Sequence, residues 1–144
     1  MSFATIFQLS FLLVAPFWLL MVFAPHWRWT KRIIASPWIS AAAALLYTVL
    51  VLPSIADVFT SVSNSELASV AALLGTEAGA TLGWVHFLAF DLFVGRWAYL
   101  DSREKNISAW LMAPVLFLIL MLGPFGFLLY LLVREVYARF ASKQ

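Results

Sequence analysis

Four ionisable side chains fall within one apolar stretch of the chain. His86, Asp91 and Arg96 interrupt a run of hydrophobic residues, and Glu77 stands at its start. Carboxyl and imidazole groups can donate and accept protons, and a guanidinium group carries a fixed positive charge, so these side chains mark a candidate functional site. An ionisable residue at the centre of a membrane helix costs roughly 2.5–3.5 kcal/mol on insertion scales, so it usually faces neighbouring helices and has a partner there.

Helical geometry separates these side chains. At 100° per residue, His86 and Asp91 lie about 140° apart, and Asp91 and Arg96 are about 140° apart again. A site that uses both His86 and Asp91 therefore needs neighbouring helices on two sides of this helix. The side chains therefore form two stripes along this helix. One consists of Trp84, Leu88, Asp91 and Gly95, and the other of His86, Ala89, Phe90, Phe93 and Trp97.

The same residues also have a structural interpretation. His86 would then be a helix-packing donor, and Asp91 a polar pin facing the bundle interior. We expect the partner of Asp91 to be one of four groups: Tyr47, Thr48, or a carbonyl freed beside Pro114 or Pro124. The residues alone do not decide whether His86 and Asp91 have a catalytic or a structural role.

Several classes of site are disfavoured. The chain has no cysteine and two histidines, of which His26 lies in an expected loop, so no metal site is predicted. Di-iron membrane hydroxylases need many more His or Glu ligands. A net charge of +2 is too small to indicate nucleic acid as a partner.

The composition places the chain in a lipid bilayer. Of its 144 residues, 64% are hydrophobic and 11% charged, and its mean hydropathy is +0.94; soluble domains carry about 25% charged residues. We predict an all-α integral membrane protein, one transmembrane domain over residues 1–144, with a proline-kinked bundle of about four transmembrane helices. A spanning helix needs about 20 apolar residues, and the runs of this kind cover residues 3–25, 37–59, 78–100 and 109–133.

The distribution of Lys and Arg predicts an orientation. They gather in the first and third connections, whereas the N-terminus and the middle connection have none, so both termini should be non-cytoplasmic. The basic tail (Arg134, Arg139 and Lys143) conflicts with this. A fold-back at residues 123–126 would remove the conflict, but each half would have only about 12 residues, too few to span. The prediction is therefore a kinked fourth helix that runs through.

The motif around Asp91 resembles a known family. Glu77 is followed by Trp84-Val85-His86, then by Asp91-Leu92-Phe93 and Arg96. Supporting matches are Pro16-Phe17, Ala24-Pro25 with the basic turn after it, and the segment from Gly123 to Leu128. The pattern is similar to that of the abscisic-acid-deficient-four-like proteins, whose plant members are linked to neoxanthin synthesis in the chloroplast.

The resemblance implies conversion of violaxanthin, an epoxycarotenoid, to neoxanthin, an allenic alcohol, without net redox change. Asp91 or Glu77 would be the acid at the epoxide oxygen, His86 the base at the neighbouring carbon, and Arg96 a charge partner. The expected ligand is a carotenoid taken from the bilayer, and no cofactor is required. The aromatic residues expected to contact it are Trp84, Phe90, Phe93 and Trp97.

Two other functions stay open. One is a non-catalytic carotenoid-binding or structural subunit of a larger photosynthetic or respiratory complex, with other membrane subunits as partners. The other is a proton-coupled carrier using Asp91, which needs an inverted repeat that the two halves do not show. Because the chain begins directly at its first span, we expect a multi-pass protein of a bacterial plasma membrane or a thylakoid-type membrane.

Overall fold

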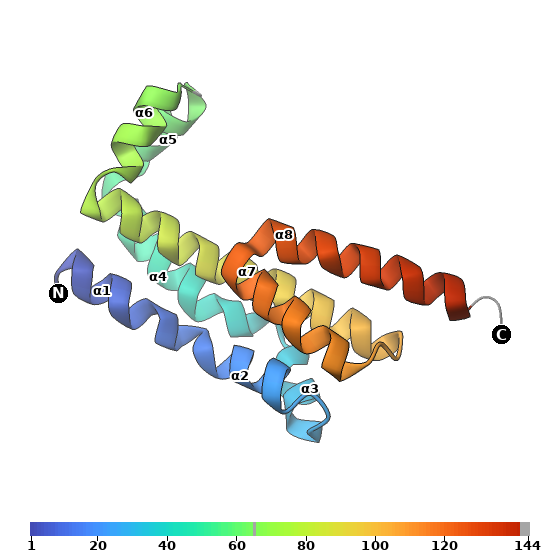
Figure 1. The fold of residues 1–144 in the computed structure, drawn as a ribbon. Coiled ribbons are helices and arrows are strands. Elements are labelled where there is room, and N and C mark those ends of the chain that lie inside the picture. The colour runs from blue at the N-terminus through green and yellow to red at the C-terminus, as the bar shows by residue number, and fades with distance from the viewer. Residues whose placement is uncertain (65, 142–144) are drawn as a thin grey trace.

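The first apolar segment is helical with one irregular turn. In a computed structural model that describes residues 1–64 and 66–141, it forms α1 (Phe3–Ser10), a 3₁₀ turn (Phe11–Leu13) and α2 (Ala15–Phe23) (Figure 1). The Ser2 hydroxyl caps α1 by accepting a hydrogen bond from the Thr5 N–H at 3.3 Å. Pro16 is accommodated because it lies in the first turn of α2, where its missing N–H has no intrahelical acceptor.

The second apolar segment follows a short basic helix, α3 (Arg28–Ala35). It consists of a 3₁₀ turn (Pro37–Ser40), α4 (Ala41–Val51), a second such turn at Pro53, and α5 (Ile55–Ser63). A further short helix, α6 (Leu67–Leu74), is the segment that was too short to span. Figure 1 shows α5 and α6 standing together away from the rest of the bundle, and neither contains a buried residue.

The central element is α7 (Glu77–Glu104), which packs against α1, α2, α3, α4, α6 and α8. Thr76 caps its start, because its hydroxyl oxygen accepts a hydrogen bond from the Gly79 N–H at 2.9 Å. Its inward face is buried at Leu88, Leu92 and Tyr99, among others. The candidate residues of the sequence motif therefore lie on the helix that most of the bundle surrounds.

The last helix, α8 (Ala109–Ala141), folds back on itself. Leu122 (φ −134°, ψ 25°) and Gly123 (φ 22°, ψ −89°) leave the helical conformation, and Figure 1 shows the two arms lying side by side. A side chain on Gly126 would collide with the backbone of Leu118 and Ile119 in the first arm. Glycine permits the positive φ at the turn, and Pro124 then starts the second arm with its φ already fixed near the helical value.

Within residues 1–64 and 66–141, four helical segments have the length and the apolar composition needed to cross a membrane: Phe3–Phe23, Pro37–Ser63, Glu77–Glu104 and Ala109–Phe140. The predicted all-α membrane bundle is thus confirmed. The prediction that the fourth helix is kinked but does not fold back was wrong, since its two arms reverse direction at Leu122 and Gly123. The minimum length of a spanning helix does not apply to an arm that ends inside the bundle. Irregular backbone is tolerated at that depth when protein surrounds it or when it lines a cavity.

The fold-back also changes where the chain ends. Arg134 in the second arm pairs with Asp101 near the end of α7, at 2.8 Å, so α8 ends at the same end of the bundle as α3. Figure 1 shows the N-terminus at the opposite end, so the start of the chain and the end of α8 lie at opposite ends of the bundle. All Lys and Arg residues that the structure describes now belong to one basic end, made of residues 25–35, 96–110 and 134–140. Lys143 lies outside the described residues.

Candidate functional site

Asp91 lies halfway along α7, against the turn of α8. A Cβ built on Gly123 would be 2.6 Å from Oδ1 of Asp91. The two elements line a cavity of about 620 Å³, here called the fold-back pocket. Its lining residues are Phe11, Trp84, Phe87, Leu88, Asp91 and the turn 120–125.

The fold-back pocket is apolar, with two unpaired polar groups. The Asp91 carboxyl makes no hydrogen bond or ion pair with any other described residue. The indole N–H of Trp84 is buried and has no acceptor within the described chain, although the ring stacks on Phe7 with centroids 5.0 Å apart. The Asp91 side chain is half-buried. Because polar groups removed from water without partners are destabilising, a ligand that brings an oxygen atom into the pocket would stabilise both groups.

The broken backbone contributes to the same cavity. Proline has no N–H to donate, so Pro124 cannot continue the hydrogen-bond ladder of the first arm. A helix broken in this way exposes backbone polar groups beside a cavity, as in many membrane proteins whose binding sites lie at discontinuous helices. A mostly apolar cavity with a few polar groups that fix orientation is typical of small-molecule sites.

The expected partners of Asp91 need correction. Asp91 faces the bundle interior, between buried Leu88 and buried Gly95, and it meets α8 beside Pro124. No hydrogen bond forms with Tyr47 or Thr48, because both lie on the other side of α7. Thr48 donates to the carbonyl of Ala44 at 2.8 Å.

His86 lies on the outer face of α7 and is exposed. Its ring packs against Phe90 (centroids 4.7 Å apart) and edge-on against Tyr47 of α4 (5.6 Å). It lines two smaller cavities along α4 and α7, of about 280 and 220 Å³, and neither includes Asp91. The structure therefore separates the expected acid from the expected base.

Glu77 and Arg96 also lie apart from the fold-back pocket. Glu77 is exposed at the first turn of α7, where its carbonyl accepts a hydrogen bond from the Thr81 hydroxyl at 2.7 Å. Arg96 donates from Nη2 to the carbonyl of Ala35 at 2.5 Å, which ties α7 to the end of α3. The four residues proposed for catalysis are thus not gathered into one site.

The four aromatic residues expected to contact a pigment are similarly divided. Trp84 lines the fold-back pocket, whereas Phe90 lines the smaller cavity beside His86. Phe93 is exposed. Trp97 packs edge-on against Phe127 and Tyr130 in the second arm of α8.

Sequence reasoning missed two features. The first is the turn 120–125 as part of the pocket, for which the glycines and proline at 123–126 were the available signal. The second is Asp101, which accepts hydrogen bonds from Tyr130 Oη (2.5 Å), Arg134 Nε (2.8 Å) and Lys105 Nζ (2.9 Å) and so holds the second arm of α8 against α7.

Within residues 1–64 and 66–141, no three His, Asp or Glu side chains converge as a metal site.

Comparison with known proteins gives a family. A family model described as ABA DEFICIENT 4-like matches residues 5–130. The chain belongs to this family. A relative of this ABA DEFICIENT 4-like chain is "Protein ABA DEFICIENT 4, chloroplastic" of Arabidopsis thaliana, which is 29% identical over 111 residues, or 73% of the chain and 50% of the relative.

The chain spans about half the length of that curated relative. No solved structure matches the chain. The resemblance read from the motif around Asp91 is confirmed at the level of the family. The family match also covers every residue that lines the fold-back pocket of this ABA DEFICIENT 4-like chain, from Phe11 to Phe125.

Proposed function

We propose that this chain binds the end ring of an epoxycarotenoid in the fold-back pocket and isomerises it to an allenic alcohol, with Asp91 as the acid–base group. The observation that carries the proposal is the unpaired Asp91 carboxyl in an otherwise apolar pocket at the turn of α8. Membership of the ABA DEFICIENT 4-like family supports a carotenoid as the substrate class.

The reaction needs one proton donor and one proton acceptor. The epoxide C–O bond beside the polyene breaks, an O–H bond forms, and a C–H bond on the neighbouring polyene carbon breaks to give the allene. The oxygen gains one proton and the carbon loses one, so no oxidant or reductant is involved. A carboxyl group can perform both transfers, because one of its oxygens donates while the other accepts. The Trp84 N–H is a suitable donor to hold the substrate oxygen.

The pocket suits a ligand that arrives from the bilayer. Phe87 and Phe125 line it and are 59% and 57% exposed on the lipid-facing surface. An end ring can therefore enter between them while the polyene chain stays along the outside of the bundle. A volume of about 620 Å³ is within the usual range of roughly 300–1,000 Å³ for small-molecule pockets.

The family resemblance implied a different arrangement, in which His86 is the base and Asp91 the acid. A substrate would have to reach both faces of α7 to meet Asp91 and His86 together, since they line separate cavities. In our proposal His86 does not take part in proton transfer. Substitution of the two residues therefore distinguishes the arrangements.

The test is conversion of violaxanthin by the purified chain in mild detergent, with products separated by chromatography. Asp91→Asn should retain pigment and lose at least about 100-fold in rate, since general acid–base groups contribute about 10²–10⁴-fold. The matched control is Asp57→Asn, which changes an exposed acid in α5 and should leave the rate unchanged. Undiminished conversion by Asp91→Asn, or loss of conversion by His86→Gln alone, would contradict the assignment.

A second candidate function is a non-catalytic carotenoid-binding or structural subunit of a photosynthetic or respiratory complex. The observation that favours it is the α5–α6 pair, which projects from the bundle with large apolar side chains exposed, including Phe59 and Leu67. Such a surface suits packing against other membrane subunits. Pigment that co-purifies unchanged, together with stoichiometric partner chains, would favour this function over the isomerase.

We propose an orientation in which the basic end faces the cytoplasm, or the equivalent side of a thylakoid-type membrane. The reason is that the described Lys and Arg residues gather at that end. The N-terminus would then be non-cytoplasmic, as expected from the sequence, and the end of α8 cytoplasmic.

A further inference from the structure

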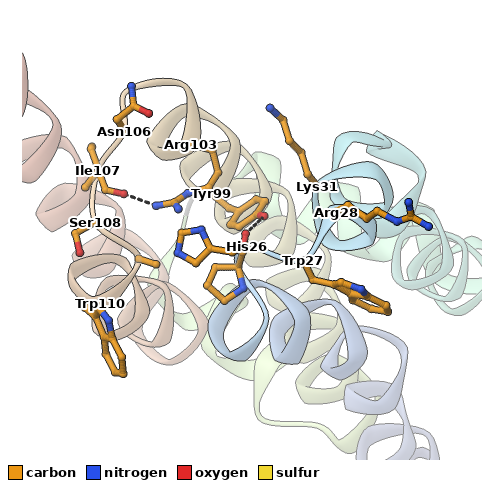
Figure 2. A pocket seen from close by; sticks show the side chains of 12 residues that line it. His26, Trp27, Arg28, Lys31, Tyr99, Arg103, Asn106, Ile107, Ser108 and Trp110 are labelled. Carbon is orange, nitrogen blue, oxygen red and sulfur yellow. Dashed lines mark hydrogen bonds between the residues drawn. The ribbon is translucent and has the colours of Figure 1, made fainter.

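A second large cavity lies at the basic end, far from Asp91. It has a volume of about 610 Å³ and is here called the basic pocket, lined by residues 25–28, Lys31, Tyr99, Arg103 and residues 106–110 (Figure 2). Its walls come from three separate places in the chain: the loop and start of α3, the end of α7, and the start of α8. No part of the proposed isomerisation uses it.

The charges around the basic pocket are all of one sign. Its twelve lining residues include Arg28, Lys31, Arg103 and His26, and no Asp or Glu. The Arg28 side chain points away from the cavity (Figure 2), and its guanidinium lies 5.4 Å from the centroid of the Trp29 ring. The acidic residues nearest in sequence are Glu104, which is exposed and does not line the pocket, and Asp101, which is already engaged by Lys105 and Arg134. Such a cavity attracts an anion, and its own residues leave the positive charge uncompensated.

The positions of the donors favour an anion with several oxygen atoms. Arg103 donates from Nη2 to the carbonyl of Ile107, as Figure 2 shows, but its Nε is buried without an acceptor in the described chain. Ser108 precedes α8, and Ala109 and Trp110 are its first residues, whose N–H groups have no intrahelical acceptors. Guanidinium, ammonium and helix N–H donors together match the oxygens of a phosphate group.

The surroundings indicate where that phosphate comes from. Trp27 and Trp110 border the cavity and are 53% and 90% exposed, and tryptophan rings are enriched at the level of lipid headgroups. The cavity lies at the ends of apolar helices, where headgroups would be found. Basic pockets between membrane helices are known to bind anionic lipid headgroups.

We propose that the basic pocket is a binding site for the phosphate headgroup of an anionic phospholipid, taken from the leaflet at the basic end. The lipid phosphate lies between α3 and the start of α8, and its acyl chains extend past Trp27 and Trp110 into the bilayer. A bound lipid would join these two elements to the end of α7, so it would stabilise the bundle as well as occupy the cavity.

The test measures lipid binding by native mass spectrometry on the full chain in neutral detergent. Short-chain phosphatidylglycerol should bind more tightly than phosphatidylcholine with the same acyl chains, and inorganic phosphate should compete only weakly. Lys31→Gln should weaken phosphatidylglycerol binding by about fivefold. Circular dichroism checks that each variant remains helical.

Arg32→Gln is the matched control. Lys31 and Arg32 are adjacent in α3, yet only Lys31 lines the basic pocket. Arg32→Gln should therefore leave the Kd unchanged. Equal weakening by Lys31→Gln and Arg32→Gln would overturn the site in favour of a general surface-charge effect. Equal binding of the two phospholipids would also overturn it, and phosphate binding as tightly as the lipid would replace the lipid with a free anion.

Discussion

Gly123 in the turn of α8 lies directly against the carboxyl group of Asp91 in α7. A Cβ on Gly123 would be 2.6 Å from Oδ1 and 3.4 Å from Cγ of Asp91. The backbone break of one helix is thus packed on the ionisable side chain of another. This contact defines one wall of the fold-back pocket and leaves no room for a larger residue at position 123.

Gly123→Ala should destabilise the protein and impair pigment binding. The residue has φ of 22°, where a Cβ is strained, and such strain costs about 1–3 kcal/mol; the added methyl group would also press on Asp91. Thermal unfolding in detergent measures the first effect, and pigment retention the second. Gly83→Ala is the control, since its Cβ would meet only Leu74 at 3.4 Å. Equal melting temperatures for the two variants would contradict the packing described for the turn.

The fold-back makes a topological prediction that cysteine labelling can check. The chain has no native cysteine, so single cysteines at Ser63, Ser108 and Ala138 report without background. All three positions are exposed. A membrane-impermeant maleimide should label Ser108→Cys and Ala138→Cys from one side of the membrane and Ser63→Cys from the other. Labelling of positions 63 and 138 from the same side would mean that α8 runs through the membrane.

Asp101 should be coupled energetically to the second arm of α8. It accepts hydrogen bonds from Tyr130 and Arg134, so Asp101→Asn should lower the free energy of unfolding by about 1–3 kcal/mol. In a double-mutant cycle with Arg134→Gln the two effects should be less than additive, because both variants lose the same contact.

The control is the exposed pair of Glu135 and Arg139, for which Glu135→Gln should change the free energy of unfolding by less than about 0.5 kcal/mol. Additive effects of Asp101→Asn and Arg134→Gln would show that the contact contributes nothing.

Arg96 should prove to be a structural residue. Its guanidinium donates to the carbonyl of Ala35, and a hydrogen bond to a charged group contributes about 1.5–3 kcal/mol. Arg96→Gln should therefore lower the melting temperature, and Arg96→Lys should restore part of the loss. The rate of violaxanthin conversion per folded molecule should be unchanged in both. A large loss of rate in a variant with normal stability would instead place Arg96 at the reacting groups.

The apolar segments and the face of α7 that carries Asp91 could be predicted from the sequence. Lengths of about 20 apolar residues indicate membrane helices without knowledge of their packing. The 100° period of a helix likewise places Asp91 with Leu88 and Gly95 and away from His86, as found. Gly95 on the same face allows Trp18 of α2 to pack closely against α7, because a side chain at position 95 would strike the indole ring.

The fold-back and the two pockets required the tertiary structure. Gly123 and Pro124 permit either a kink or a reversal, and the local sequence has the same propensities in both cases. The reversal is stabilised by contacts far apart in the chain, such as those of Trp97 with Tyr130 and of Asp101 with Arg134. Periodicity and residue type carry no information about such pairs, because their energies depend on which helices become neighbours. That choice set the end of α8 at the basic end and left Asp91 facing a cavity instead of a partner.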